Sequence, residues 1–217
     1  MQSIEKSAYL EKLLSFAIGE KAQDEAEKIL SAYRVPMNIA SSSSSILQNI
    51  SGCSEQTADF IRLIAAISSR RITDEFKIGK KYTKEEIERY VCALLFHLSV
   101  ESVYMFSFDK GGKLISADLL SEGTINSSAF LPRKMLDFAL RRKAKSVIIA
   151  HNHPSGNPLP SENDIVVTLL AKEILNDAQI ELSAHYISVG FSIYNCLEGA
   201  LCNAKETSKI STVDMLL

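Results

Sequence analysis

The segment from His151 to Asp164, which also contains His153 and Ser161, directly follows the apolar run 147–150. If that run is a buried strand, His151 and His153 lie at its carboxyl end on one face, because strand side chains alternate. Asp164 then falls in the first turn of the next helix. Two imidazoles and one carboxylate, with a fourth position open, are the composition of a catalytic zinc site. The spacing predicts a hydrolase that uses a metal-bound water.

The loop between the histidines and the helix is rich in proline. Pro154, Pro158 and Pro160 are three of the five prolines in the chain. Their fixed φ angles lower the entropy cost of holding one loop shape, which suits a site that needs well-placed ligands. Neither H-E-x-x-H nor the deaminase pattern occurs, and four histidines are too few for a barrel amidohydrolase.

A second interpretation of the same segment needs no metal. Ser161 and Asp164 have the spacing of a helix cap, in which the hydroxyl accepts a backbone N–H and the acid lies at the positive end of the helix. The histidines are then polar residues at a strand end. Capping alone accounts for neither the histidines nor the proline loop, and for Ser161 it is compatible with metal binding.

The elements around this segment predict a helical region followed by an α/β domain. Apolar residues recur every three to four positions through residues 1–70, and the serine run 41–45 could cap a helix near Ile46. A hydrophilic stretch, 70–84, reads as a connection. Beyond residue 90 we expect strands at 103–108, 113–120, 146–151, 181–189 and 191–197, with helices from Pro132 and over 161–178. Alternating strands and helices indicate a central sheet flanked by helices.

Composition predicts an ordinary soluble protein. Hydrophobic residues make up 46% of the 217 residues, charged residues make up 23%, and the net charge is −2. No stretch approaches the ~20 apolar residues of a membrane span, and residues 1–9 lack the apolar core of a secretory signal. The four cysteines show no C-x-x-C pattern. We therefore expect a cytoplasmic protein without a membrane partner.

The whole string H-N-H-P-S-G-x-P-x-P-S-x-x-D resembles the JAMM motif of JAB/MPN metalloproteases, in the form found in the bacterial RadC-like family, long labelled a DNA repair family. Further matches are the segment 123–126, the pair Pro132-Arg133, and Ala150 before His151. The resemblance implies a helical module with its linker over 1–84, a JAB/MPN-type α/β (α+β) domain over 85–204, and a tail over 205–217.

The same resemblance implies roles for five residues. His151, His153 and Asp164 are the ligands of one zinc ion, with water in the fourth position. Glu101 is the general base, and an acid directly before an apolar strand is in keeping with that role. The Ser161 hydroxyl stabilises the oxyanion. The implied substrate is a peptide or an isopeptide-linked protein.

Some residues leave alternatives open. Glu122 is a rival acid, and a solvated strand end is the plain interpretation of Glu101. His185 is expected to support the site or the fold rather than to bind metal. Relatives usually carry an acid where this chain has Lys134, and often an aspartate where it has Ala184; the second change removes a partner of the late histidine.

The N-terminal region resembles the helix-hairpin-helix module of the family, which binds phosphates through backbone N–H groups. The match over 50–58 is partial, because Ser54 replaces the second glycine. Over 1–84 there are 12 Lys/Arg and 10 Asp/Glu, a difference of +2, which is weak for a phosphate-binding surface. A basic cluster at 70–81 is also explained as a solvated connection. A DNA-associated accessory protein with little catalysis is thus the alternative to a hydrolase, and a purely structural protein is a third.

Overall fold

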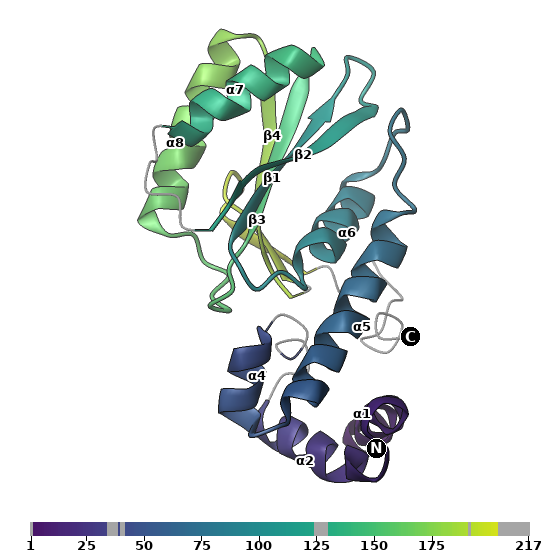
Figure 1. Ribbon diagram of the computed structural model, residues 1–217. Helices are drawn as coiled ribbons and strands as arrows, with labels where there is room; N and C mark the ends of the chain where they lie inside the picture. Colours follow the sequence, from purple (N-terminus) through teal and green to yellow (C-terminus); the bar gives the residue numbers. More distant parts are fainter. Residues whose placement is uncertain (1, 34–38, 40–41, 124–129, 191, 204–217) are drawn as a thin grey trace.

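The computed structural model of the chain has a helical module at the N-terminus and a sheet packed between helices (Figure 1). It describes residues 2–33, 39, 42–123, 130–190 and 192–203. The expected α/β class, with a helical region in front of it, is confirmed. The tail 205–217 lies outside the described residues.

Among the described residues up to 73, four long segments are helical, as the apolar spacing predicts. They are α1 (Gln2–Ile18), α2 (Ala22–Ala32), α4 (Ser44–Ser51) and α5 (Glu55–Thr73), with a short 3-10 turn, Gly19–Lys21, between α1 and α2. The serine run does cap a helix: the Ser43 side chain accepts a hydrogen bond from the Ile46 N–H at the start of α4.

The turn between α4 and α5 is the part that resembles a phosphate-binding hairpin. Gly52 ends α4 in the left-handed region at φ 69°, and Ser54 caps α5. The backbone N–H of Ser54 donates to Oε2 of Glu25, a buried residue of α2, at 2.7 Å. The Ser54 amide is therefore already hydrogen-bonded to a carboxylate of the chain itself.

Helix α5 contacts both halves of the molecule. Its first turns pack on the N-terminal helices, whereas Ala65 lies against Phe96 and Ile72 against Ala93, next to or within α6 (Lys84–Leu95). The expected connection over 70–84 differs from the structure, because α5 continues to Thr73 and the rest is held by the sheet. Hydrogen bonds join this stretch to the turn between the first two strands, where Lys81 forms a β-bridge with Lys113.

The sheet has six strands in the order β2-β1-β3-β4-β5-β6. They are β1 (Ser102–Phe108), β2 (Leu114–Glu122), β3 (Ser146–Asn152), β4 (Glu181–Val189), β5 (Ser192–Asn195) and β6 (Ala200–Asn203). Only β3 and β4 pair in parallel. Five strands lie close to their expected positions, and β6 was not expected.

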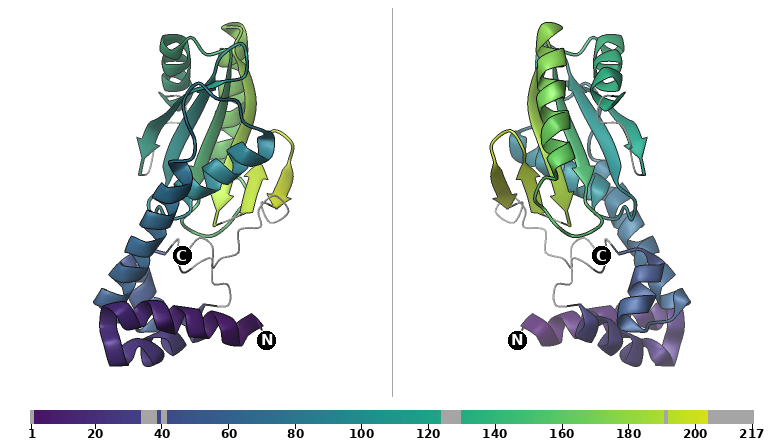
Figure 2. Two further views of the ribbon diagram at one scale, coloured as in Figure 1. Left: turned by 90° about the vertical axis from the view of Figure 1, so that its right-hand side faces the viewer. Right: turned by 90° about the vertical axis from the view of Figure 1, so that its left-hand side faces the viewer.

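Helices cover both faces of the sheet (Figure 2). On one face, α7 (Phe130–Arg142) and α8 (Glu162–Asp177) pack on Val103, Met105 and Ile149; on the other, α6 packs on Phe106 and Ala150. Because side chains alternate, the face of Ile149 also carries His151. The fold thus directs this histidine toward α8. No helix among the described residues is long and apolar enough to cross a membrane.

Candidate metal centre

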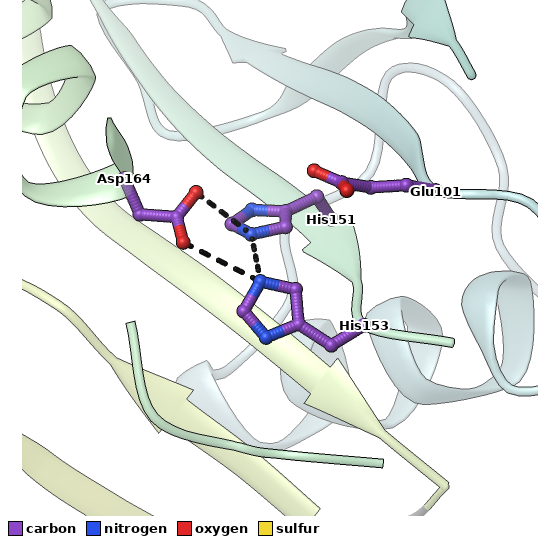
Figure 3. A group of neighbouring side chains, drawn as sticks. All are labelled: Glu101, His151, His153 and Asp164. Atoms are coloured by element: carbon purple, nitrogen blue, oxygen red, sulfur yellow. Dashed lines mark hydrogen bonds and ion pairs between the residues drawn. The ribbon is translucent and has the colours of Figure 1, made fainter. Parts of the chain in front are cut away.

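Three elements bring the predicted site residues together. His151 lies in β3 and His153 directly after it, Asp164 is in the first turn of α8, and Glu101 immediately precedes β1. Strands β1 and β3 are antiparallel, with Val103 opposite His151, so the start of β1 lies beside the end of β3. Figure 3 shows the four side chains turned toward one another. One ligand atom from each lies within 4.8 Å of the others.

The separations of the three expected ligand atoms match a tetrahedral metal site. His151 Nε2 lies 3.0 Å from His153 Nε2 and 3.2 Å from Asp164 Oδ1, and His153 Nε2 lies 3.4 Å from Asp164 Oδ2. Metal bonds of about 2.0–2.1 Å in a tetrahedron separate ligand atoms by about 3.3 Å. The donor set therefore fits zinc in both chemistry and size.

The proline loop orients His153. Its Nδ1 lies 2.8 Å from the backbone oxygen of Asn157. A carbonyl oxygen only accepts, so Nδ1 carries the hydrogen and donates it. The lone pair of the neutral ring is then on Nε2, the atom that faces His151 and Asp164. This loop thus presents His153 in the form that binds metal.

The helix cap and the metal-site geometry occur together. The Ser161 hydroxyl accepts from the Asp164 N–H, and the Asp164 carboxylate accepts from the Ser161 N–H at 2.7 Å, which completes a capping box. The hydroxyl also donates to Asp164 Oδ2 at 2.6 Å. Ser161 consequently holds the carboxylate with Oδ1 toward His151, and its single hydrogen is engaged there rather than with a substrate oxygen.

Ionisable groups are concentrated at the candidate metal centre. Burial opposes ionisation of Asp164, but the facing imidazoles of His151 and His153 and the hydrogen bond from Ser161 outweigh it and hold the pKa of the carboxyl below its ordinary value. The Asp164 carboxylate in turn raises the pKa of His153. His151 and Asp164 are both buried. A buried carboxylate facing two imidazole nitrogens is a strong site for a cation.

The site opens into a cavity of about 370 Å³. Its polar wall includes Glu101, His153, Ser161 and Asp164, and its apolar residues include Val103 and Met135. Glu101 is exposed to solvent, whereas the expected ligands are buried or half-buried. A reactant entering the cavity therefore meets Glu101 and the open side of the three-ligand cluster together.

The other residues singled out in the sequence take different places. Glu122 is exposed at the end of β2, paired with Ser102, and lies outside the four-residue group found in the described part of the chain. The Lys134 ammonium donates to the backbone oxygen of Leu120. Ala184 is buried on the opposite face of the sheet from His151. Of the matching segment at 123–126, residues 124–126 lie outside the described residues.

Asn152 is a residue that the sequence analysis missed. Its buried side chain accepts from the Ser102 N–H at 2.8 Å and donates to the backbone oxygens of Leu98 and Val100 at 3.0 and 3.1 Å. These contacts hold the segment that carries Glu101. The sequence shows an asparagine between two histidines. The hydrogen-bond partners of its side chain, however, lie about fifty residues away in sequence, where no local pattern reveals them.

Residues 82–198, more than half of the chain, match the family model of the RadC-like JAB domain. A UPF0758 protein of Bordetella avium is 36% identical over 127 residues, which cover 58% of this chain and 56% of that protein. A UPF0758 protein of Fusobacterium nucleatum is 29% identical over 202 residues, covering 88% and 87%. One from Herminiimonas arsenicoxydans is 29% identical over 139 residues, covering 64% and 62%. The chain thus spans less than two thirds of the first and third relatives.

Proposed function

Because this chain belongs to the RadC-like JAB domain family, we propose that it is a zinc-dependent metallopeptidase or isopeptidase. His151, His153 and Asp164 would hold one zinc ion. The observation that supports this most strongly is the set of separations, 3.0, 3.2 and 3.4 Å, among donor atoms that come from two separate elements. Hydrogen bonds from each imidazole to another group hold the ring in place.

Bound zinc would lower the pKa of a coordinated water toward about 7 and polarise the substrate carbonyl. Glu101 then accepts the proton of the attacking water, because its carboxylate reaches the same point as the ligand atoms and opens on the cavity. Glu101 next passes this proton to the leaving amine. Proton transfer by a positioned carboxylate contributes on the order of 10²–10⁴-fold to rate.

Ser161 has two tasks in this proposal. In the resting site its hydroxyl orients Asp164. To stabilise the oxyanion, the hydroxyl exchanges that partner for the substrate oxygen, while the Ser161 backbone N–H continues to hold the carboxylate. The rotation of one hydroxyl hydrogen is enough for this exchange.

Elemental analysis of the purified full chain, beside the His153→Ala variant, tests the proposal. We expect one zinc per chain in the wild type and a large loss in the variant. We also expect wild-type cleavage of a lysine-isopeptide or peptide substrate library and none by the variant. The Asn157→Ala variant is the control, because it keeps the backbone oxygen that His153 contacts. A wild-type chain that binds no zinc at micromolar concentrations contradicts the proposal.

A second candidate function, association with DNA, is favoured by one surface. Exposed lysines of the 74–83 stretch and of the β1–β2 turn meet at the end of the sheet opposite the metal centre. We call this the lysine surface; it comprises Lys77, Lys80, Lys81, Lys110 and Lys113. Asp109 lies among them, and its carboxylate accepts the backbone N–H groups of Gly111 and Lys113. By contrast, the Ser54 amide in the turn between α4 and α5 already donates a hydrogen bond to Glu25.

Salt dependence of duplex-DNA binding tests this second function. If the lysine surface contacts phosphates, affinity falls steeply with salt. Replacing Lys80, Lys81 and Lys113 by glutamine lowers the slope of log affinity against log salt by about one per lysine. Glu101→Gln should leave binding unchanged. An identical slope in the triple variant excludes this surface.

A further inference from the structure

We propose that His185 and Thr168 are positioning residues that fix the ring tautomer of His151 and keep its Nε2 lone pair directed at the metal. The inference rests on the proposed function only where it names zinc as the recipient of that lone pair. The hydrogen bonds that select this tautomer are made within the chain, and so their effect on the His151 ring can be measured apart from catalysis.

The contacts form an unbroken buried series. His151 Nδ1 lies 3.1 Å from His185 Nε2, and His185 Nδ1 lies 2.6 Å from the Thr168 hydroxyl. The same hydroxyl donates to the backbone oxygen of Asp164 at 2.5 Å. All four residues are less than a tenth exposed. Burial on this scale favours direct partners over exchange with solvent.

The direction of every hydrogen bond in the series follows from the group at its end, the Asp164 carbonyl oxygen. The Asp164 carbonyl oxygen can only accept, so the single hydrogen of the Thr168 hydroxyl points to it. The hydroxyl oxygen must then accept from His185, which places a hydrogen on His185 Nδ1. His185 Nε2 is therefore the acceptor, and the hydrogen between the two imidazoles belongs to His151 Nδ1. The remaining lone pair of His151 is on Nε2.

The opposite tautomer of His151 is disfavoured by the same contacts. A hydrogen on His151 Nε2 would leave its Nδ1 lone pair facing the His185 Nε2 lone pair across 3.1 Å. Turning the Thr168 hydrogen toward His185 would relieve that contact, but it would set two oxygen lone pairs 2.5 Å apart. A buried acceptor without a donor costs about 1–3 kcal/mol. Each rearrangement carries at least one such cost. In the proposed tautomer the Nε2 lone pair faces His153 Nε2 and Asp164 Oδ1, and a cation bound between these three atoms satisfies it.

The series also closes into a ring. It starts at the backbone of Asp164 in α8, passes through Thr168 in the same helix and His185 in β4, and reaches His151 in β3. His151 Nε2 in turn faces the Asp164 carboxylate at 3.2 Å. The two ligands are thus tied to each other through side chains of α8 and β4. His153 stands apart, because Asn157 orients it.

The test uses the full chain labelled with ¹⁵N-histidine, both with zinc bound and freed of metal, and its four histidines give four ring systems in a long-range ¹H–¹⁵N spectrum. We expect His151 to show a protonated Nδ1 in the wild type. Thr168→Val replaces the hydroxyl by a methyl group and keeps the β-branched shape of the side chain. In this variant we expect a mixture of His151 tautomers and zinc affinity lower by about 10–100-fold, measured against a competing chelator.

Thr168→Ser is the matched control, because it keeps the hydroxyl and should retain the wild-type tautomer and affinity. His185→Leu is a second variant, which removes the acceptor for His151 and is expected to act in the same direction. A wild-type His151 spectrum in both Thr168→Val and His185→Leu overturns the inference. If the tautomer changes as expected but no form of the chain binds zinc, the positioning role stands and the proposed function fails.

Discussion

Glu101 differs from the other members of the candidate metal centre because it is exposed and lies immediately before the start of a strand. The ligands are held by their neighbours on several sides, whereas a proton carrier must reach first the water and then the leaving group. An exposed carboxylate at the cavity mouth has the required access. At the residue scale, binding and catalysis should therefore be separable.

Replacing Glu101 by glutamine should lower turnover of a cleavable substrate by about 10²–10⁴-fold, because the amide cannot accept the proton. Zinc content should stay at one per chain. Glu122→Gln is the matched control, since Glu122 is an exposed acid outside the four-residue group. Turnover by stopped assay and zinc by elemental analysis distinguish the two variants. Equal loss in both would contradict the assignment of Glu101.

The residues that the sequence revealed are those whose signal is local. The spacing of His151, His153 and Asp164 predicts a shared face and a helix start, and the structure brings these side chains together. The Thr168–His185 series and the Asn152 contacts could not be predicted, because their partners come from elements far apart in the chain. Hydrogen-bond partners of this kind follow from the register of β3 and β4, which no local pattern specifies.

At the scale of elements, the entry to β1 depends on the end of β3. Asn152 alternates with the two histidines and therefore points to the other face, where it joins the backbone of the segment before β1. One short stretch thus supplies two residues of the candidate metal centre on one side and, on the other, an amide that holds the segment of Glu101. The strand pattern predicted β1 and β3 well, but it did not predict this link.

Asn152→Ala leaves the Ser102 N–H and two carbonyl oxygens without their side-chain partner. We expect a loss of about 2–3 kcal/mol in the free energy of unfolding, since buried unpaired groups cost about 1–3 kcal/mol. We also expect reduced turnover with zinc retained, because Glu101 loses its position. Urea unfolding and a zinc assay measure both effects. Asn157→Ala, an amide lost from the exposed loop, serves as control, and a similar effect of the two substitutions would contradict the role of Asn152.

At the scale of the whole molecule, a buried carboxylate joins two N-terminal helices. Glu25 in α2 accepts from the Ser54 N–H at the start of α5 and from Lys28. Burial opposes its ionisation, but the hydrogen bond from Ser54 and those from neighbouring side chains lower its pKa from 4.5 to about 2. The stabilisation is thus complete above pH 4.5 and disappears as the pH falls toward 2.

Glu25→Gln should therefore destabilise the chain by about 1.5–3 kcal/mol at pH 7, the range for hydrogen bonds to a charged group. The difference from the wild type should shrink steadily below pH 4.5. Urea midpoints at several pH values give the comparison. Glu27→Gln on the same helix is the control, because Glu27 is exposed. A difference that grows on acidification would contradict the role of Glu25.

Helix α5 limits where a shorter fragment of the protein can begin. A fragment beginning at residue 82, where the family match starts, would uncover Ala93 and Phe96, which α5 shields in the intact chain. Apolar surface that becomes exposed in this way promotes self-association. An expression fragment of the half that matches the RadC-like JAB domain should therefore begin at residue 55 or earlier, so that it keeps the whole of α5 over this apolar surface.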